Sequence, residues 1–301
     1  MRSGGLIWIP LTLAATAAQV LRTARQHELR QFLSASGAAY VRFLFAWPFA
    51  LLLGLGTWLR MFDGAAIQRS FWLWSVTAGV VQIIGTVLLL RSFRARDFAI
   101  GTVYSKAEVI LVAIGSAVFL NEPLRGLGWV GAAVVLVGVA LLTATSGIEA
   151  ALQRWGDPAA WLGIGAGLFF ALSAVGIRGA ATSITGATLW ERTSLTLLVI
   201  LSCQALFHGA YLAVTDCNQL AVIWKHRSEC LPVGLLSFAG TTGWIAAMAV
   251  ATAAKVRALG QVEIVLVFLI SVIRLREHHP LRDYLGSGLV LMGVLLVVIL
   301  G

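Results

Sequence analysis

The sequence predicts an all-α polytopic membrane protein whose ten transmembrane helices form two inverted five-helix repeats. The prediction depends on the composition, on ten apolar windows and on an internal repeat. Of the 301 residues, 59% are hydrophobic and only 12% are charged, and the mean hydropathy is +0.90. A soluble domain carries about twice this charged fraction. Because apolar blocks recur from end to end, the chain has many spans and not one anchor.

Apolar windows of about 20 residues, the length that crosses a bilayer, define the expected helices. The first follows Met-Arg-Ser-Gly-Gly without a small-residue cleavage site, so we expect a retained span and not a signal peptide. Backbone groups in lipid must bond within the segment, so each window is expected to be a helix. The windows are 5–24, 36–58, 71–90, 98–119, 124–143, 158–178, 186–214, 232–253, 258–274 and 281–300.

A repeat appears when the chain is shifted against itself by 155 residues. Glycines and carboxylates then coincide, and apolar residues match in kind. The matches predict two modules, 1–145 and 156–301. Matched positions are Gly79, Gly85 and Thr86 with Gly234, Gly240 and Thr241; Glu108 with Glu263; Ser116 with Ser271; Glu122 with Glu277; and Gly131 and Gly138 with Gly286 and Gly293.

Five helices per module is an odd number, so the second module must enter the membrane from the opposite side. The modules are then related by an axis in the membrane plane. Inverted repeats of this kind are the architecture of secondary transporters, whose substrate site lies near the midplane where the halves meet. Duplication that only enlarges a helix bundle is the alternative, and we consider transport the better explanation.

Several motifs resemble the EamA family of the drug/metabolite transporter superfamily. They are Glu122-Pro123-Leu124 with the glycines that follow, the stretch Ser-Gly-Ala-Ala-Tyr-Val-Arg-Phe-Leu-Phe that contains Arg42, and Glu191-Arg192 in helix seven. The second module departs from the pattern, with "EHHPLRDYLG" where the first has "EPLRGLG". The resemblance implies ten helices around a central cavity, lined by helices one to four and six to nine. It also implies an exporter in a bacterial inner (plasma) membrane.

Glu108 and Glu263 are the principal candidates for the functional site. Fourteen residues of helix place them roughly 21 Å from Glu122 and Glu277, past the midplane of a hydrocarbon core about 30 Å thick. Ionisable groups at such depth face a watery cavity or a partner. They therefore bind a proton or an organic cation, or they form ion pairs with Lys106, Arg42 or Arg192 that lock helices together. Glu122 and Glu277 are expected at the interface in structural roles.

Lys106 cannot pair with Glu108 along one helix face, because residues two apart point to different sides. It needs a carboxylate from another helix, a carbonyl or an anionic substrate group. Its repeat position is Gln261, so the symmetry of the halves is broken there. We also expect Tyr104, Gln82 and Trp244 to contribute to the substrate site. Arg22 and Arg25, which share a face with Gln19, either line a groove or extend to the headgroups.

Other classes of protein are disfavoured by the sequence. The excess of basic residues, formally +9, lies between apolar blocks, where it sets orientation, so we expect no nucleic-acid partner. No enzyme motif, metal pattern or cofactor motif is present. The basic loops favour termini outside the cytoplasm, whereas the resemblance implies termini inside, so the orientation stays open. Whether Cys217 and Cys230 form a disulfide depends on that orientation.

The primary hypothesis is a secondary active transporter of a small organic metabolite that works by alternating access, with protons as a candidate coupling ion. A site with both charge signs suits zwitterions. The alternative is a mover of lipid-linked or amphipathic headgroups through a laterally open cavity, and a non-transporting helper is a third reading. The expected partners are the metabolite and the lipid bilayer, with a monomer or a homodimer as the oligomeric state.

Overall fold

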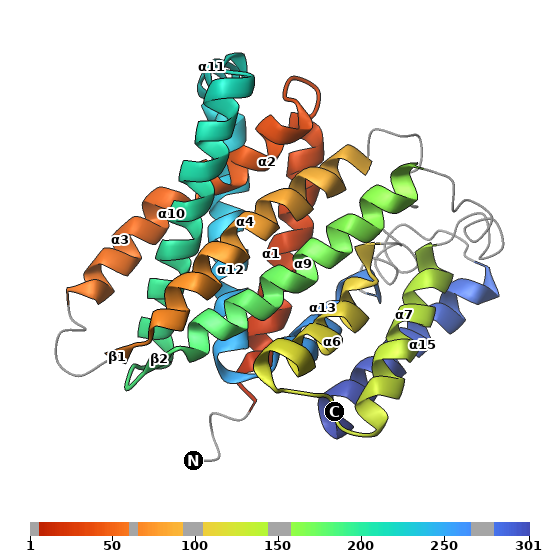
Figure 1. Ribbon diagram of the computed structural model, residues 1–301. Coiled ribbons are helices and arrows are strands. Elements are labelled where there is room, and N and C mark those ends of the chain that lie inside the picture. The colour runs from red at the N-terminus through yellow and green to blue at the C-terminus, as the bar shows by residue number, and fades with distance from the viewer. Residues whose placement is uncertain (1–5, 60–65, 93–104, 144–157, 266–279) are drawn as a thin grey trace. The chain divides into compact units, whose positions relative to one another are not determined.

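The computed structural model describes residues 6–59, 66–92, 105–143, 158–265 and 280–301. These residues are almost entirely helical, and Figure 1 shows the elements. The helices are α1 (Trp8–Leu29), α2 (Ala35–Leu44), α3 (Trp47–Trp58), α4 (Arg69–Ser92), α6 (Glu108–Leu120), α7 (Leu127–Thr143), α9 (Pro158–Thr182), α10 (Leu189–Thr215), α11 (Asn218–Lys225), α12 (Arg227–Val250), α13 (Ala253–Gly260) and α15 (Leu281–Leu300), and the strands are β1 (Ala66–Ile67) and β2 (Ile184–Thr185).

The described residues contain six helices long and apolar enough to cross a membrane, together with two shorter apolar helices. The six are 35–58, 69–92, 161–182, 189–215, 227–250 and 281–300, and the shorter ones are 108–120 and 127–141. Large apolar side chains point outward along them, such as Leu52 at 76% exposure and Val118 at 69%. The all-α polytopic membrane fold is therefore confirmed. Residues 98–104 and 266–274 of two predicted windows lie outside the described part.

Three local features differ from the sequence-based expectation. The second window is divided between α2 and α3, with Pro48 in the first turn of α3, where its missing N–H costs nothing. A short helix, α11, occupies part of the expected connection between the seventh and eighth windows. A two-residue antiparallel ladder joins Ala66 to Thr185 and Ile67 to Ile184.

The chain forms two compact units, and each unit contains residues from both halves of the sequence. Met1–Val87 and Gly176–Ala251 make unit 1, and Leu88–Val175 and Thr252–Gly301 make unit 2. The proposed repeat boundaries, 1–145 and 156–301, stay a prediction.

Unit 1 is built around α10 and α12. α12 packs against α1, where a methyl group added at Gly243 would lie 2.9 Å from the Cβ of Ala15. α10 packs against α3, and Gly54 admits the side chain of Leu198. Small residues at such contacts let helices approach closely in lipid, where burial of apolar surface supplies little driving force. An apolar cluster of Phe71, Ala180, Ile184 and Leu195 adjoins the strand pair.

Unit 2 contains an antiparallel pair, α7 and α15, that lie side by side in Figure 1. A methyl group at Gly131 would lie 2.8 Å from the carbonyl oxygen of Gly293, and one at Gly138 would lie 2.8 Å from that of Gly286. Gly131 and Gly138 are the repeat equivalents of Gly286 and Gly293. Replacing each residue by its repeat equivalent therefore converts one contact into the other. This is the property of an isologous two-fold interface. For these two helices the predicted inversion is confirmed.

Candidate functional site

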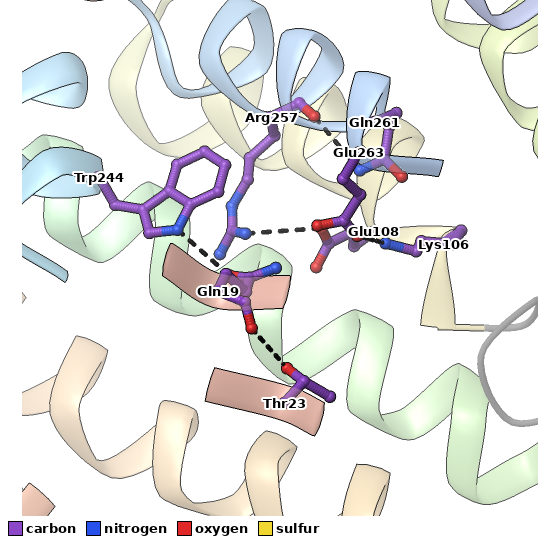
Figure 2. Close-up of polar contacts among 8 residues, drawn as sticks. All are labelled: Gln19, Thr23, Lys106, Glu108, Trp244, Arg257, Gln261 and Glu263. Carbon is purple, nitrogen blue, oxygen red and sulfur yellow. Dashed lines mark hydrogen bonds and ion pairs between the residues drawn. The ribbon is translucent and has the colours of Figure 1, made fainter. Parts of the chain in front are cut away.

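The start of α6 with the turn that precedes it, and the segment from α13 to residue 265, bring together four charged side chains in unit 2. Lys106 Nζ donates a hydrogen bond to Glu263 Oε1 and forms an ion pair with it. Arg257 Nη1 lies 3.6 Å from Glu108 Oε1. Figure 2 shows both pairs. We call Lys106, Glu108, Arg257 and Glu263 the charge cluster.

The charge cluster is shielded from the surroundings but not completely closed. The side chains of Arg257 and Glu108 are 8% and 9% exposed, and those of Lys106 and Glu263 are 11% and 13% exposed. Two positive and two negative groups balance formally. Charges taken out of water are costly unless they are paired and hydrogen-bonded, so the cluster is held together by mutual neutralisation.

Helical geometry explains why the pairs cross between elements. Lys106 and Glu108 are two residues apart and cannot meet on one helix face, so each takes a partner from the second half of the chain. For Lys106 the partner is a carboxylate from another helical segment, one of the three possibilities that the sequence leaves open. Ion pairing of the glutamates is the alternative to ligand binding that the sequence leaves open, but the partner of Glu108 is Arg257 and not Arg42 or Arg192.

The helical backbone is interrupted at repeat-equivalent positions beside these charges. A turn at Lys106–Ala107 precedes α6, and Gln261 interrupts the helix between α13 and residues 262–265. The N–H of Val109 donates to the carbonyl of Lys106, and that of Ile264 donates to the carbonyl of Gln261. These bonds span three residues and coincide under the 155-residue shift. Interrupted helices at matching places in two halves are typical of transporter binding sites.

Gln261 has a donor that is satisfied and an acceptor that is not. Its Nε2 donates to the carbonyl oxygen of Arg257 at 3.3 Å. Its Oε1 is buried and accepts no hydrogen bond within the described part of the chain, and the residue is 3% exposed. Because a carbonyl can only accept, the amide must turn its nitrogen toward Arg257, which leaves the oxygen free.

Unit 1 holds four of the other predicted site residues, and each of them forms a hydrogen bond with a neutral side chain or with backbone. Arg42 Nη1 donates to Thr86 Oγ1 at 3.1 Å, and Gln82 Oε1 accepts from Gln204 Nε2 at 2.6 Å. Arg192 Nη1 donates to the carbonyl of Ala249, near the carboxyl end of α12, at 3.3 Å. A cation near a helix C-terminus is favourable there.

Trp244, the fourth, donates from Nε1 to Gln19 Oε1 at 3.1 Å and is 6% exposed. Figure 2 draws this contact and the bond from Thr23 to the Gln19 carbonyl. Arg22, on the same face of α1 as Gln19, is buried, whereas Arg25 forms an exposed pair with Glu28 at 3.4 Å. Tyr104 lies outside the described residues.

The expected structural glutamates and cysteines are only partly described. Glu122 follows the left-handed Asn121 after the end of α6, and its N–H donates to the Ser116 carbonyl at 3.0 Å. Glu277 lies outside the described part. Cys217 is exposed and Cys230 is fully buried, and both are free thiols.

Sequence analysis missed Arg257, Gln204 and His208. The apolar window begins at 258 and excludes Arg257, whereas α13 begins at Ala253 and buries this residue. Its spacing of four residues before Gln261 was the available signal. Gln204 and His208 lie one turn apart on α10, and both are buried. His208 Nε2 and Ser36 Oγ are 2.8 Å apart.

Comparison with known proteins gives a family and a fold. The sequence profile of the EamA-like transporter family matches residues 5–144 and 157–299. A solved structure titled "Crystal structure of protein" is similar with a TM-score of 0.68 and 14% sequence identity, and the match covers 99% of this chain and 98% of the other. At this identity the likeness shows the fold alone. No curated protein matches the sequence.

Proposed function

Because the chain belongs to the EamA-like transporter family, and is thus a membrane transporter of the drug/metabolite type, we propose that it is a secondary active transporter. It exports a small organic metabolite by alternating access, so that one site opens first to one face of the membrane and then to the other. The observation that carries this proposal is the charge cluster, in which repeat-equivalent glutamates lie beside repeat-equivalent helix interruptions.

The charge cluster supports a transport site through its balance of charge. Each glutamate is held by a cation that a substrate or a proton can replace. When a substrate ammonium binds a carboxylate, the displaced Lys106 or Arg257 is available to an anionic group of the same substrate. Exchange of this kind keeps the buried charge neutral at every stage, which avoids the high cost of an isolated charge in a region of low dielectric.

Proton coupling would use the same two carboxyl groups. A carboxyl group withdrawn from water favours its neutral form, whereas a neighbouring cation favours its charged form. Movement of Lys106 away from Glu263, or of Arg257 away from Glu108, therefore promotes uptake of a proton, and its return promotes release. Coupling then follows from the making and breaking of the two ion pairs.

The test is transport by purified protein in liposomes. Amino acids, polyamines, nucleosides and vitamins are screened at several pH values for thermal stabilisation, and a stabilising compound is then used in radiolabelled flux with and without a pH gradient. We expect Glu108→Gln and Glu263→Gln to abolish the effect of the gradient. If both correctly folded variants carry the compound with unchanged pH dependence, the coupling is wrong. If the unaltered protein carries no compound that it binds, the transport function is wrong.

A further inference from the structure

Beside the charge cluster, Gln261 presents a buried hydrogen-bond acceptor that the described part of the chain leaves open. This acceptor is Gln261 Oε1, which accepts no hydrogen bond within the described residues although the side chain is 3% exposed. A buried acceptor without a donor costs free energy, and most such groups in proteins find a partner. What sets this acceptor apart from other buried polar atoms without a partner is its place beside two ion pairs, where a charged ligand can supply the donor.

Pseudo-symmetry explains why the open position is here. Gln261 is the repeat equivalent of Lys106, and Glu108 is the equivalent of Glu263. Full symmetry would place a cation at 261 to bind Glu108, as Lys106 binds Glu263. Arg257, one helical turn earlier, binds Glu108 instead. The second half thus has its cation at 257, and position 261 has a neutral amide that contributes an acceptor.

The hydrogen-bond acceptors in and beside the charge cluster are suited to a ligand group that carries several N–H donors and a positive charge. They are the carboxylates of Glu108 and Glu263 and the amide oxygen of Gln261, and none of them donates. Figure 2 shows the amide end of Gln261 directed to the side on which the carboxylates and Lys106 Nζ lie. A primary ammonium has three N–H donors and one positive charge. The ammonium of Lys106 already occupies Glu263 in this way.

We propose that Gln261 is the specificity-determining residue of the charge cluster and accepts a hydrogen bond from a primary ammonium group of the substrate, with Glu263 as the counter-ion. The proposal rests on the proposed function, since it assigns the ligand of the same site. It requires N–H donors and not merely positive charge. A trimethylammonium group carries the same charge but cannot donate, so it leaves Gln261 Oε1 without a partner.

The experiment uses two matched pairs of probes with the purified full-length protein. Butylammonium is compared with butyltrimethylammonium, and 4-aminobutyrate is compared with 4-(trimethylammonio)butyrate. Within each pair the charge is the same, and three methyl groups replace the three N–H donors. Between the pairs, a carboxylate replaces the terminal methyl group. The variants below separate the loss of donors from the added volume of the methyl groups. Binding is measured by calorimetry in detergent, so no transport is needed. We expect each primary ammonium to bind about tenfold or more tightly than its trimethylated partner, because a hydrogen bond to a charged group is involved.

Two variants connect this preference to position 261. Gln261→Met keeps the approximate size and removes the acceptor, and we expect the preference to fall to about threefold or less. Gln261→Glu keeps an acceptor oxygen, and we expect the preference to persist, which also shows that substitution at this site is tolerated. The proposal is overturned if trimethylated probes bind equally well, if the preference survives in Gln261→Met, or if neither primary ammonium binds.

The outcomes separate this proposal from the proposed function. Binding of the primary ammonium probes without flux in liposomes would leave the subsite standing and remove the transport function. If the protein transports compounds whose binding does not depend on N–H donors, the transport function stands and the proposed subsite is removed.

Discussion

The interiors of the two units stabilise buried polar groups by different means. In unit 1, neutral partners predominate among the described contacts: Gln82 binds Gln204, Ser36 binds His208, and Trp244 binds Gln19. In unit 2, carboxylates bind cations directly, as Glu263 does with Lys106. Neutral hydrogen bonds contribute about 0.5–1.5 kcal/mol each, whereas breaking a buried ion pair costs several times more. Among these contacts, the larger electrostatic free energy therefore lies in unit 2.

The largest expected effect is the loss of one partner of an ion pair in unit 2. Lys106→Met leaves the Glu263 carboxylate buried without its counter-ion, and we expect it to lower the free energy of unfolding by about 3–5 kcal/mol. Reversible unfolding of the purified protein in detergent measures the loss. The double variant Lys106→Met/Glu263→Leu removes both charges and should recover most of it. A double variant as unstable as the single one would mean that the pair is not coupled.

The counterpart in unit 1 is Gln204→Leu. Removal of the Nε2 donor leaves Gln82 Oε1 without that bond, and we expect a loss of about 1–3 kcal/mol. The same unfolding measurement applies, with Gln82→Leu/Gln204→Leu as the control in which both polar groups are absent. A loss equal to that of Lys106→Met would contradict the distinction between the two interiors.

Packing in unit 2 can be tested apart from its charges. Gly131→Ala places a methyl group against the Gly293 carbonyl, so α7 and α15 must separate slightly, at an expected cost of about 1–3 kcal/mol. Gly288→Ala on α15, the partner helix, is the control, because a methyl group there meets open space. We expect no loss for the control, since alanine favours the helix. Equal losses at both positions would show that close packing is not the cause.

The smallest effect is expected at a charge pair on the surface of unit 1. The side chains of Arg25 and Glu28 are 62% and 60% exposed, so water and salt screen their attraction. Arg25→Ala should change the free energy of unfolding by no more than about 0.5 kcal/mol. A larger loss would mean that the difference in solvent exposure does not explain why the ion pairs of the charge cluster contribute more to stability than the Arg25–Glu28 pair.

Sequence reasoning predicts the fold well because hydropathy and a five-helix repeat act over long stretches of chain. It also identifies Lys106, Glu108 and Glu263, because charges within apolar windows are rare. It does not identify Arg257, whose helix begins earlier than hydropathy indicates. Nor does it identify Gln204, which is one neutral residue in a 27-residue helix. Partners of this kind are chosen by tertiary packing, which a one-dimensional pattern does not encode.

The antiparallel contact of α7 with α15 has a consequence for the evolution of the chain. Gly131 meets Gly293 and Gly138 meets Gly286 at backbone distance, so neither member of a pair can enlarge unless the two backbones move apart. Positions 131, 138, 286 and 293 should therefore all be restricted to the smallest side chains. Among descendants of the same duplication, each module then constrains which substitutions its twin can accept.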